Sequence, residues 1–339
     1  LVITRSSMRS RRYRLRGGKM PEAKFISVKS VEQASRLLKE QPPPESALMA
    51  GGTDLLVLRR LKLLAPKSII YLKSIPGLRE IRLDKNGGII IGAMATLDEV
   101  ARHPGINKSY PLLAKAAFAV ASMQIRNKGT FGGNICLNSR CWFYNRSPFW
   151  RSEYPECRKA GGDKCYVIPA SRRGCFALQS GDTVGPLVAL DAKLRVISED
   201  EERVIGLEDF FLGDGMRYLA LEPGEILAEV LLPPFRASGA FVKWRPQNNL
   251  DFATFTLSVL PPQNRSGSRI VVGSVASRPL RAAKAEAMLD QGGKELSAIA
   301  RQAAQELSLV SFVRGSVEFK RQIIEARLTE ILNSFFVHR

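Results

Sequence analysis

The distribution of cysteine is the feature that most constrains this chain. All five cysteines of the 339 residues fall between Cys136 and Cys175. They directly follow Thr130-Phe131-Gly132-Gly133-Asn134, in which a glycine pair allows the backbone to approach a phosphate closely. Soft sulfur ligands next to such a loop indicate redox chemistry, with a nucleotide cofactor and an iron–sulfur centre side by side.

The spacing of the cysteines leaves the kind of site open. Cys141, Cys157, Cys165 and Cys175 are separated by 15, 7 and 9 residues, and Cys136 precedes Cys141 with four residues between them. No CxxC pair occurs, so zinc-ribbon and bacterial ferredoxin patterns do not match. The intervening residues are rich in turn formers, which lets loops converge at irregular spacing. An iron–sulfur cluster, a zinc site and unliganded buried cysteines all remain possible.

Basic and aromatic residues surround these cysteines. The basic ones favour anionic thiolates and a reduced cluster, or form a solvated surface. The aromatic ones shield a cluster from solvent, or form the core of the segment. The basic residues are Arg158, Lys159, Lys164, Arg172 and Arg173. The aromatic residues are Trp142, Phe143, Phe149 and Trp150.

Composition bounds the class of protein. The chain is 45% hydrophobic, which predicts two or three domains with large cores. No apolar run reaches the roughly 18 residues of a membrane span, and a disulfide scaffold is not expected at this length without a secretory signal. Net charge is +19, of which residues 1–19 supply seven positive charges. We expect that segment to be a disordered, solvated extension, with Met8 or Met20 as the true start, and nucleic-acid binding to be unlikely.

A second glycine pair lies nearer the N-terminus. Ala47–Ala50 reads as a strand, Gly51-Gly52-Thr53-Asp54 as a turn, and the residues from Leu55 to about Leu63 as a helix. This order aims free backbone N–H groups at an anion. The motif is not GxGxxG, so a Rossmann fold is not predicted. With only His103 and His338 in the chain, both expected at the surface, histidine-based catalysis is not expected.

Apolar periodicity predicts most of the other elements. Before the cysteines we expect a helix capped by Ser30, a strand at 68–72, a hairpin over 79–93 and helices near 96–101 and 111–121. After them the pattern predicts a hairpin of 187–198 with 202–206, and a strand ending at Pro233-Pro234. The last residues predict strands at 240–245, 252–259 and 269–275, then helices at 280–290, 294–307 and 316–335.

The two glycine motifs carry a family resemblance. Leu48–Leu55 together with Gln124–Asn134 resembles the FAD-binding subunit of the xanthine dehydrogenase/carbon monoxide dehydrogenase family of molybdenum hydroxylases. The resemblance covers about residues 20–337. Asn134–Cys141 and Gly162–Cys165 are similar to an insertion that binds an additional [4Fe–4S] cluster in one branch of the family, that of the 4-hydroxybenzoyl-CoA reductase beta subunit.

The resemblance implies an α+β fold in several parts. After the extension 1–19, residues 20–234 would form a two-lobed FAD-binding domain of the vanillyl-alcohol oxidase/p-cresol methylhydroxylase type. The cysteine-rich insertion would span about 137–178. Residues 235–339 would form a C-terminal α/β domain like that of the carbon monoxide dehydrogenase flavoprotein.

The resemblance also implies the residues of the site. Those expected at FAD are Met49, Ala50, Gly51, Gly52, Thr53, Asp54, Leu55, Leu56, Val120, Thr130, Phe131, Gly132, Gly133, Asn134, Asp182, Leu227 and Lys243. Within this set, Asp182 would contact the adenosine half and Val120 the adenine, while Leu227 and Lys243 would line the isoalloxazine. The implied cluster ligands are Cys141, Cys157, Cys165 and Cys175.

The implied function is electron transfer in a cytoplasmic oxidoreductase. Ferredoxin or another donor would reduce the [4Fe–4S] cluster, and FAD would pass electrons to a [2Fe–2S] subunit and a molybdenum-cofactor subunit in a dimer of heterotrimers. An aromatic acyl-CoA would be reduced there. The alternative is the flavin subunit of a xanthine, aldehyde or CO dehydrogenase-type hydroxylase without a cubane. A nucleic-acid-binding or assembly protein is a remote third possibility.

Overall fold

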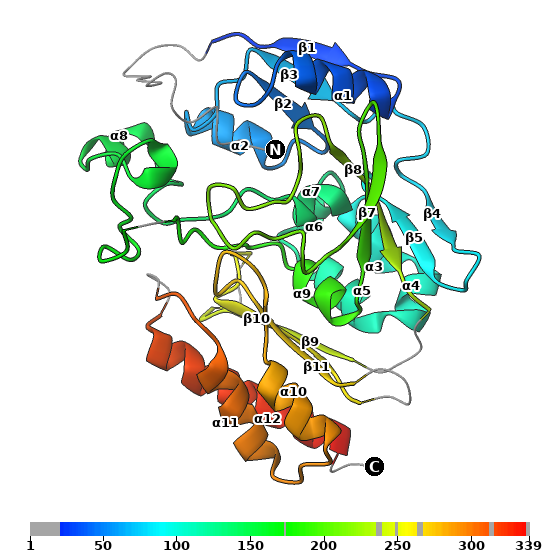
Figure 1. Cartoon of the computed structure of the whole chain (residues 1–339), viewed down its shortest axis with the longest axis vertical. Helices are drawn as coiled ribbons and strands as arrows, with labels where there is room; N and C mark the ends of the chain where they lie inside the picture. The colour runs from blue at the N-terminus through cyan, green and yellow to red at the C-terminus, as the bar shows by residue number, and fades with distance from the viewer. Residues whose placement is uncertain are drawn as a thin grey trace.

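The computed structural model describes residues 21–172, 174–234, 239–247, 250–262, 267–311 and 315–336. The basic segment 1–19, Arg173 and His338 lie outside these ranges. Figure 1 shows two N-terminal lobes, a C-terminal domain below them, and a loop-rich excursion at one side. This mixed arrangement of helices and sheets confirms the predicted α+β class.

The first lobe is a small parallel sheet with two helices. Its elements are β1 (Lys24–Ser27), α1 (Val31–Glu40), β2 (Ser46–Met49), α2 (Leu55–Arg60) and β3 (Ser68–Tyr71). The strand order is β1-β3-β2. The Ser30 side chain accepts a hydrogen bond from the Gln33 N–H and so begins α1 where the sequence predicted.

The second lobe is built on an antiparallel sheet of order β4-β5-β8-β6-β7. Its elements are β4 (Ile81–Leu83), β5 (Ile89–Gly92), α3 (Leu97–Arg102), α4 (Pro104–Ser109), α5 (Pro111–Phe118), α6 (Met123–Arg126), α7 (Phe131–Ile135), α9 (Val184–Ala189), β6 (Lys193–Ile197), β7 (Glu202–Gly206) and β8 (Ile226–Leu232). The largest apolar core of the chain joins this sheet to its helices and contains the fully buried rings of Tyr110, Phe131 and Phe210.

The C-terminal domain is a four-stranded antiparallel sheet followed by three helices. Its elements are β9 (Ala240–Trp244), β10 (Phe255–Leu260), β11 (Arg269–Gly273), β12 (Leu280–Arg281), α10 (Ala283–Asp290), α11 (Leu296–Glu306) and α12 (Val317–Phe336). The three helices cover one face, and α5 and α9 pack against the other (Figure 1). All six residues of β10 are buried, as expected for a strand covered on both faces. None of the described helices is long and apolar enough to cross a membrane.

The cysteine-rich segment leaves and rejoins the second lobe at one place. Arg140 and Leu178 exchange backbone hydrogen bonds of 2.8 and 2.7 Å, and the residues between them form the excursion with α8 (Pro148–Ser152) and a 3₁₀ turn at Arg158–Ala160. Part of its interior is aromatic, since the Phe143 ring lies 6.1 Å from Trp150 and 5.4 Å from Tyr166. An aromatic core was one of the two roles that the sequence left open for these residues.

Three predicted elements were wrong in part. Residues 187–190 belong to α9 and the turn after it, not to a strand, because every residue of α9 is buried and periodicity cannot distinguish a buried helix from a buried strand. Leu280 and Arg281 form the edge strand β12, so the next helix begins only at Ala283. The strand predicted at 252–259 begins only at Phe255, as β10. His103 lies between α3 and α4, where its side chain accepts a hydrogen bond from the Ile106 N–H at 3.4 Å and caps α4.

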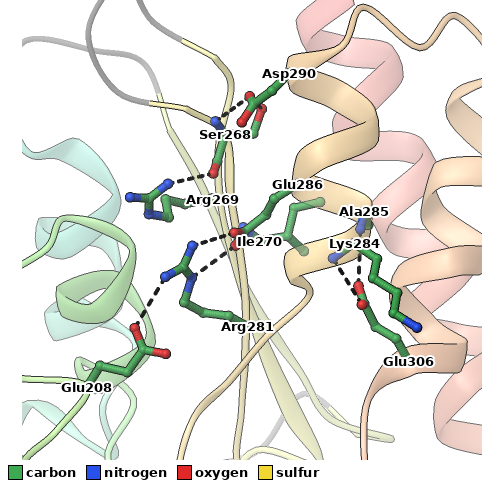
Figure 2. Close-up of polar contacts among 10 residues, drawn as sticks. All are labelled: Glu208, Ser268, Arg269, Ile270, Arg281, Lys284, Ala285, Glu286, Asp290 and Glu306. Carbon is green, nitrogen blue, oxygen red and sulfur yellow. Dashed lines mark hydrogen bonds and ion pairs between the residues drawn. The ribbon is translucent and has the colours of Figure 1, made fainter.

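Carboxylates hold the C-terminal helices to their sheet and to one another, and Glu286 among them is buried (Figure 2). Glu286 accepts hydrogen bonds from the Ile270 N–H at 2.9 Å and from Arg281 at 2.6 Å. Arg281 also lies 3.3 Å from the exposed Glu208, which belongs to the second lobe. Glu306 accepts from two N–H groups at the start of α10, at 3.0 and 3.2 Å. One arginine therefore links the domain core to the neighbouring lobe.

Replacing Glu286 should destabilise the C-terminal domain. Glu286→Ala leaves a buried N–H group and Arg281 without their acceptor, so we expect the free energy of unfolding to fall by about 2–4 kcal/mol. The control is Glu208→Ala, which removes the exposed partner of the same arginine and should cost less than about 1 kcal/mol. Urea denaturation of both variants measures this; equal losses would contradict the central role of Glu286.

Candidate functional site

Two glycine-containing loops, one from each lobe, meet backbone to backbone. Gly51-Gly52 joins β2 to α2, and Gly129–Asn134 leads into α7. A Cβ atom on Gly51 would lie 1.8 Å from the carbonyl oxygen of Lys128, so only glycine permits this approach. The Thr130 hydroxyl accepts a hydrogen bond from the Gly133 N–H at 3.1 Å and caps α7. The fold thus unites the two motifs that the sequence singled out separately.

A cavity of about 300 Å³ opens beside these loops. It is lined by both lobes and by the C-terminal domain. Most of the residues that the resemblance implied for FAD lie on its wall: Ala50, Gly51, Gly52, Thr53, Asp54, Leu55, Val120, Thr130, Gly132, Gly133, Asn134, Asp182, Leu227 and Lys243. Met49, Leu56 and Phe131 are not among the lining residues. Phe131 is fully buried in the core of the second lobe, and Leu56 is exposed.

A buried ion pair lies in the wall of this cavity. Lys243 Nζ is 2.6 Å from Asp182 Oδ2 and donates a second hydrogen bond to the Ala119 carbonyl at 3.0 Å. Burial raises the pKa of Asp182, while Lys243 and Arg245 oppose that rise. The resemblance assigned Asp182 and Lys243 to different halves of FAD, whereas the ion pair holds the two side chains at one place. The other carboxylate oxygen of Asp182 is buried without a hydrogen-bond partner.

Sequence reasoning assigned no role to two charged residues of the wall. Arg140 is bonded to Asp54 of the first loop, and its guanidinium lies 5.1 Å from the centre of the Phe252 ring. Glu225 accepts two hydrogen bonds from Arg203, at 2.6 and 2.7 Å. Both residues fall within the motifs that carry the family resemblance, so their location was signalled even though their partners were not.

Four cysteines line a second, smaller cavity. Cys141, Cys157, Cys165 and Cys175 come from separate stretches of the excursion and face the same space. Cys136 lines the larger cavity instead. The structure therefore separates the five cysteines into the same four and one that the resemblance implied, although it holds no bound group that tests them as ligands.

Tight turns bring these sulfur atoms together. Between Cys157 and Cys165 the chain reverses at Gly161, which has a φ of +101°. A Cβ on Gly162 would lie 1.7 Å from the Glu156 carbonyl oxygen, so this turn requires glycine. Burial raises the pKa of Cys175 to about 12 and also raises that of Cys141. These thiols are therefore protonated unless a metal displaces the proton.

One short segment forms part of both walls. Cys136, Leu137 and Arg140 line the large cavity, and Cys141 lines the cysteine cavity. The Tyr218 hydroxyl donates a hydrogen bond to the Cys136 carbonyl at 3.4 Å and helps to hold this segment in place. The two candidate sites are thus adjacent, separated by a few residues of well-packed chain.

Comparison with known protein families identifies the family of this chain. Residues 21–235 match the FAD-binding domain in molybdopterin dehydrogenase, and residues 246–335 match the CO dehydrogenase flavoprotein C-terminal domain. The chain belongs to the FAD-binding subunits of the molybdenum hydroxylase family. It is thus an oxidoreductase flavoprotein that works as one subunit of a multi-subunit complex.

Individual relatives support this assignment. The chain is 31% identical over 270 residues to the aldehyde oxidoreductase FAD-binding subunit PaoB of Escherichia coli, covering 77% of this chain and 84% of the relative. It is 29% identical to the nicotinate dehydrogenase FAD-subunit of Eubacterium barkeri, covering 80% of each. The solved carbon monoxide dehydrogenase of Hydrogenophaga pseudoflava superposes with a TM-score of 0.75 at 26% identity, covering 93% of this chain and 98% of that one. These names favour the alternative, the flavin subunit of a xanthine, aldehyde or CO dehydrogenase-type hydroxylase, over the predicted similarity to 4-hydroxybenzoyl-CoA reductase.

The large cavity of this flavin subunit suits FAD. Backbone N–H groups of a strand–glycine–helix turn such as Gly51–Asp54 are the usual donors to a pyrophosphate. In the second loop, the N–H groups of residues 131–134 already donate within the protein, so that loop supplies shape rather than these donors. The unpartnered oxygen of Asp182 is an acceptor for a sugar hydroxyl. The remaining wall is mainly apolar, as expected for a cofactor site.

Gly51→Ala should weaken flavin binding. The added methyl group would press on the Lys128 carbonyl and push the two loops apart, at a cost of about 1–3 kcal/mol. We expect FAD affinity to fall about tenfold to a hundredfold, measured as flavin retained after dialysis. The control is Gly206→Ala, whose Cβ would meet only the end of the Asp209 side chain at 3.2 Å. If Gly51→Ala retained as much flavin as the wild type, the close approach of Gly51 to the Lys128 carbonyl would be refuted as a requirement for flavin binding.

Glu225 should make stability depend on pH. Burial raises its pKa, but hydrogen bonds from Arg203 and from the Glu222 N–H outweigh this and leave the pKa below its ordinary value of 4.5. Such a group stabilises the fold above pH 4.5 and loses this effect as pH falls through its lowered pKa. Glu225→Gln should therefore reduce the free energy of unfolding by about 1–2 kcal/mol at pH 7.

The difference between wild type and Glu225→Gln should shrink steadily below pH 4.5, as measured by urea denaturation at several pH values. The matched control is Glu222→Gln, which removes an exposed carboxylate 3.4 Å from Arg217. Its effect should stay under about 1 kcal/mol. If the loss of unfolding free energy in Glu225→Gln grew toward low pH, the lowered pKa of Glu225 would be contradicted.

Proposed function

We propose that this flavin subunit holds an iron–sulfur cluster as well as FAD and transfers electrons between them within its molybdenum hydroxylase complex. The observation that carries the proposal is the convergence of Cys141, Cys157, Cys165 and Cys175 on one small cavity beside the larger one. The cofactors supply the redox chemistry, and the chain supplies their spacing, burial and surrounding charge.

The resemblance of the insertion favours a cubane over zinc. Each thiolate of a [4Fe–4S] cluster binds a different iron, whereas a structural zinc gathers four ligands around one ion, with sulfur at about 2.3 Å. In the part of the chain that the structure describes, which includes all five cysteines, no group of three or more histidine, cysteine or carboxylate side chains is placed to hold a metal ion. The four cysteines would therefore have to adjust their positions around either group.

The chain's own groups would orient FAD in the large cavity. The loop at Gly51-Gly52 would hold the pyrophosphate through its N–H groups, Thr130–Asn134 would lie against it, and Asp182 would accept from a hydroxyl. Lys243 would place positive charge at the same part of the cofactor. The 2.6 Å ion pair fixes both side chains before the cofactor binds, which lowers the entropic cost of binding.

The direction of electron flow would depend on whether the external redox partner donates or accepts electrons. With a donor such as ferredoxin, electrons would enter at the cysteine cavity and continue through FAD to a [2Fe–2S] subunit and a molybdenum-cofactor subunit. This order suits the reduction of an aromatic acyl-CoA, as in 4-hydroxybenzoyl-CoA reductase, and is supported by the resemblance of the insertion. Both the substrate class and a cytoplasmic location stay predictions.

A second candidate function is favoured by the names of the relatives. Aldehyde oxidoreductase, nicotinate dehydrogenase and carbon monoxide dehydrogenase are named for oxidations. In a hydroxylase of that kind, electrons would leave the molybdenum site and reach an external acceptor through FAD. The four cysteines would then be structural, or would hold a cluster that carries electrons outward.

Metal analysis of this flavin subunit, purified anaerobically and free of the [2Fe–2S] subunit, separates these functions. We expect about four irons for each FAD, and loss of most of the iron with retained FAD in Cys157→Ala. Cys136→Ala, at the other cavity, is the matched control and should keep its iron. Full iron in Cys157→Ala would overturn the ligand assignment. FAD without iron or zinc in the wild type would identify an ordinary flavin subunit, and zinc would leave a metal site without redox function.

A further inference from the structure

A buried lysine projects into the cysteine-rich excursion. Lys159 is the middle residue of the 3₁₀ turn Arg158–Ala160, is 7% exposed, and lines the cysteine cavity. Its Nζ donates hydrogen bonds to Asn138 Oδ1 at 2.8 Å, to the Ser139 carbonyl at 2.8 Å, and to the Ser139 hydroxyl. All three N–H groups are therefore used, and every acceptor is neutral.

The positive charge of Lys159 has no carboxylate partner among the described residues. Aromatic rings flank it, with Nζ 5.1 Å from the centre of Tyr144 and 5.8 Å from that of Tyr218. The side chains able to form anions that line the same cavity as Lys159 are Cys141, Cys157, Cys165 and Cys175. A buried ammonium group is costly unless an anion balances it. Thiolates in the cysteine cavity are the available anions.

Lys159 also fixes the chain between the two cavities. Its acceptors Asn138 and Ser139 belong to the segment 136–141 that lines both of them. The Ser139 hydroxyl in turn donates to the Gly215 carbonyl at 2.5 Å. The nearby Arg140 is already paired with Asp54. The positive charge of Lys159 therefore lies at the cysteine cavity and not at the FAD cavity.

We propose that Lys159 is the counter-cation of the metal–thiolate group in the cysteine cavity and raises its reduction potential. The inference rests on the proposed function, since it requires a redox-active cluster. An iron–sulfur cluster held by four thiolates is anionic and becomes more so when reduced. A nearby positive charge therefore stabilises the reduced state more than the oxidised state, and burial weakens the screening of that effect. Lys159 acts on the potential as a positioning residue and takes no part in bond making.

The test is a redox titration of the cluster, monitored by electron paramagnetic resonance, in the complete complex. Lys159→Met removes the charge, Lys159→Gln removes the charge but keeps a hydrogen-bond donor, and Lys159→Arg keeps the charge. We expect more negative midpoint potentials in the first two and a potential close to wild type in the third. Lys320→Met is the matched control. Lys320 is also a buried lysine, but its Nζ donates to the Val310 carbonyl at 2.7 Å and only burial acts on it. Its variant should keep the wild-type potential.

The iron content of the flavin subunit separated from each complex, measured beside each titration, distinguishes the outcomes. Wild-type protein without iron would refute the proposed cluster itself. Iron-loaded Lys159→Met and Lys159→Gln with the wild-type potential would overturn the role of Lys159 alone. If both neutral variants lose iron and Lys159→Arg retains it, the charge is required to hold the cluster, which supports the proposal. Loss of iron in all three would show a purely structural role and overturn it.

Discussion

Close approach of two backbone segments at Gly51 is the constraint on which this architecture depends. The first lobe reaches the second at the Lys128 carbonyl, where no side chain fits. Because the loops meet there, both loops, the apolar wall and the Asp182–Lys243 pair surround one space. The C-terminal sheet supplies Lys243 to that space while packing on α5 and α9, so all three parts of the chain build one cofactor site.

Much of this site follows from the sequence because local chemistry specifies it. A strand, a glycine pair and a helix in that order aim N–H groups at an anion, but the same order is an ordinary turn in most proteins, so the resemblance decided between the two. The capping residues Ser30, Thr96 and Thr130 begin helices through contacts only three residues away. The division of the cysteines into four and one came from the resemblance, since their spacing alone left zinc and unliganded sulfur open.

Other features depend on partners that lie far apart in the chain. The Arg140–Asp54, Arg203–Glu225 and Lys243–Asp182 pairs join residues from different elements, and no periodicity predicts which charges will meet. Burial of the whole of α9 removes the amphipathic signal that would mark it as a helix. Lys159 was one of several basic residues near the cysteines, and only the fold shows that it is buried beside them while Lys164 and Arg172 are exposed or partly exposed.

The excursion that carries the cysteines has a narrow attachment. It leaves the second lobe at Arg140 and returns at Leu178, where two backbone hydrogen bonds close its base. A segment whose two ends already lie side by side can lengthen or shorten at little entropic cost to the rest of the fold. Beyond the base, Arg151 donates to the Leu61 carbonyl at 2.9 Å and the Gly215 N–H donates to the Cys175 carbonyl at 2.7 Å. The length of the excursion can therefore vary at low entropic cost only between its anchoring contacts.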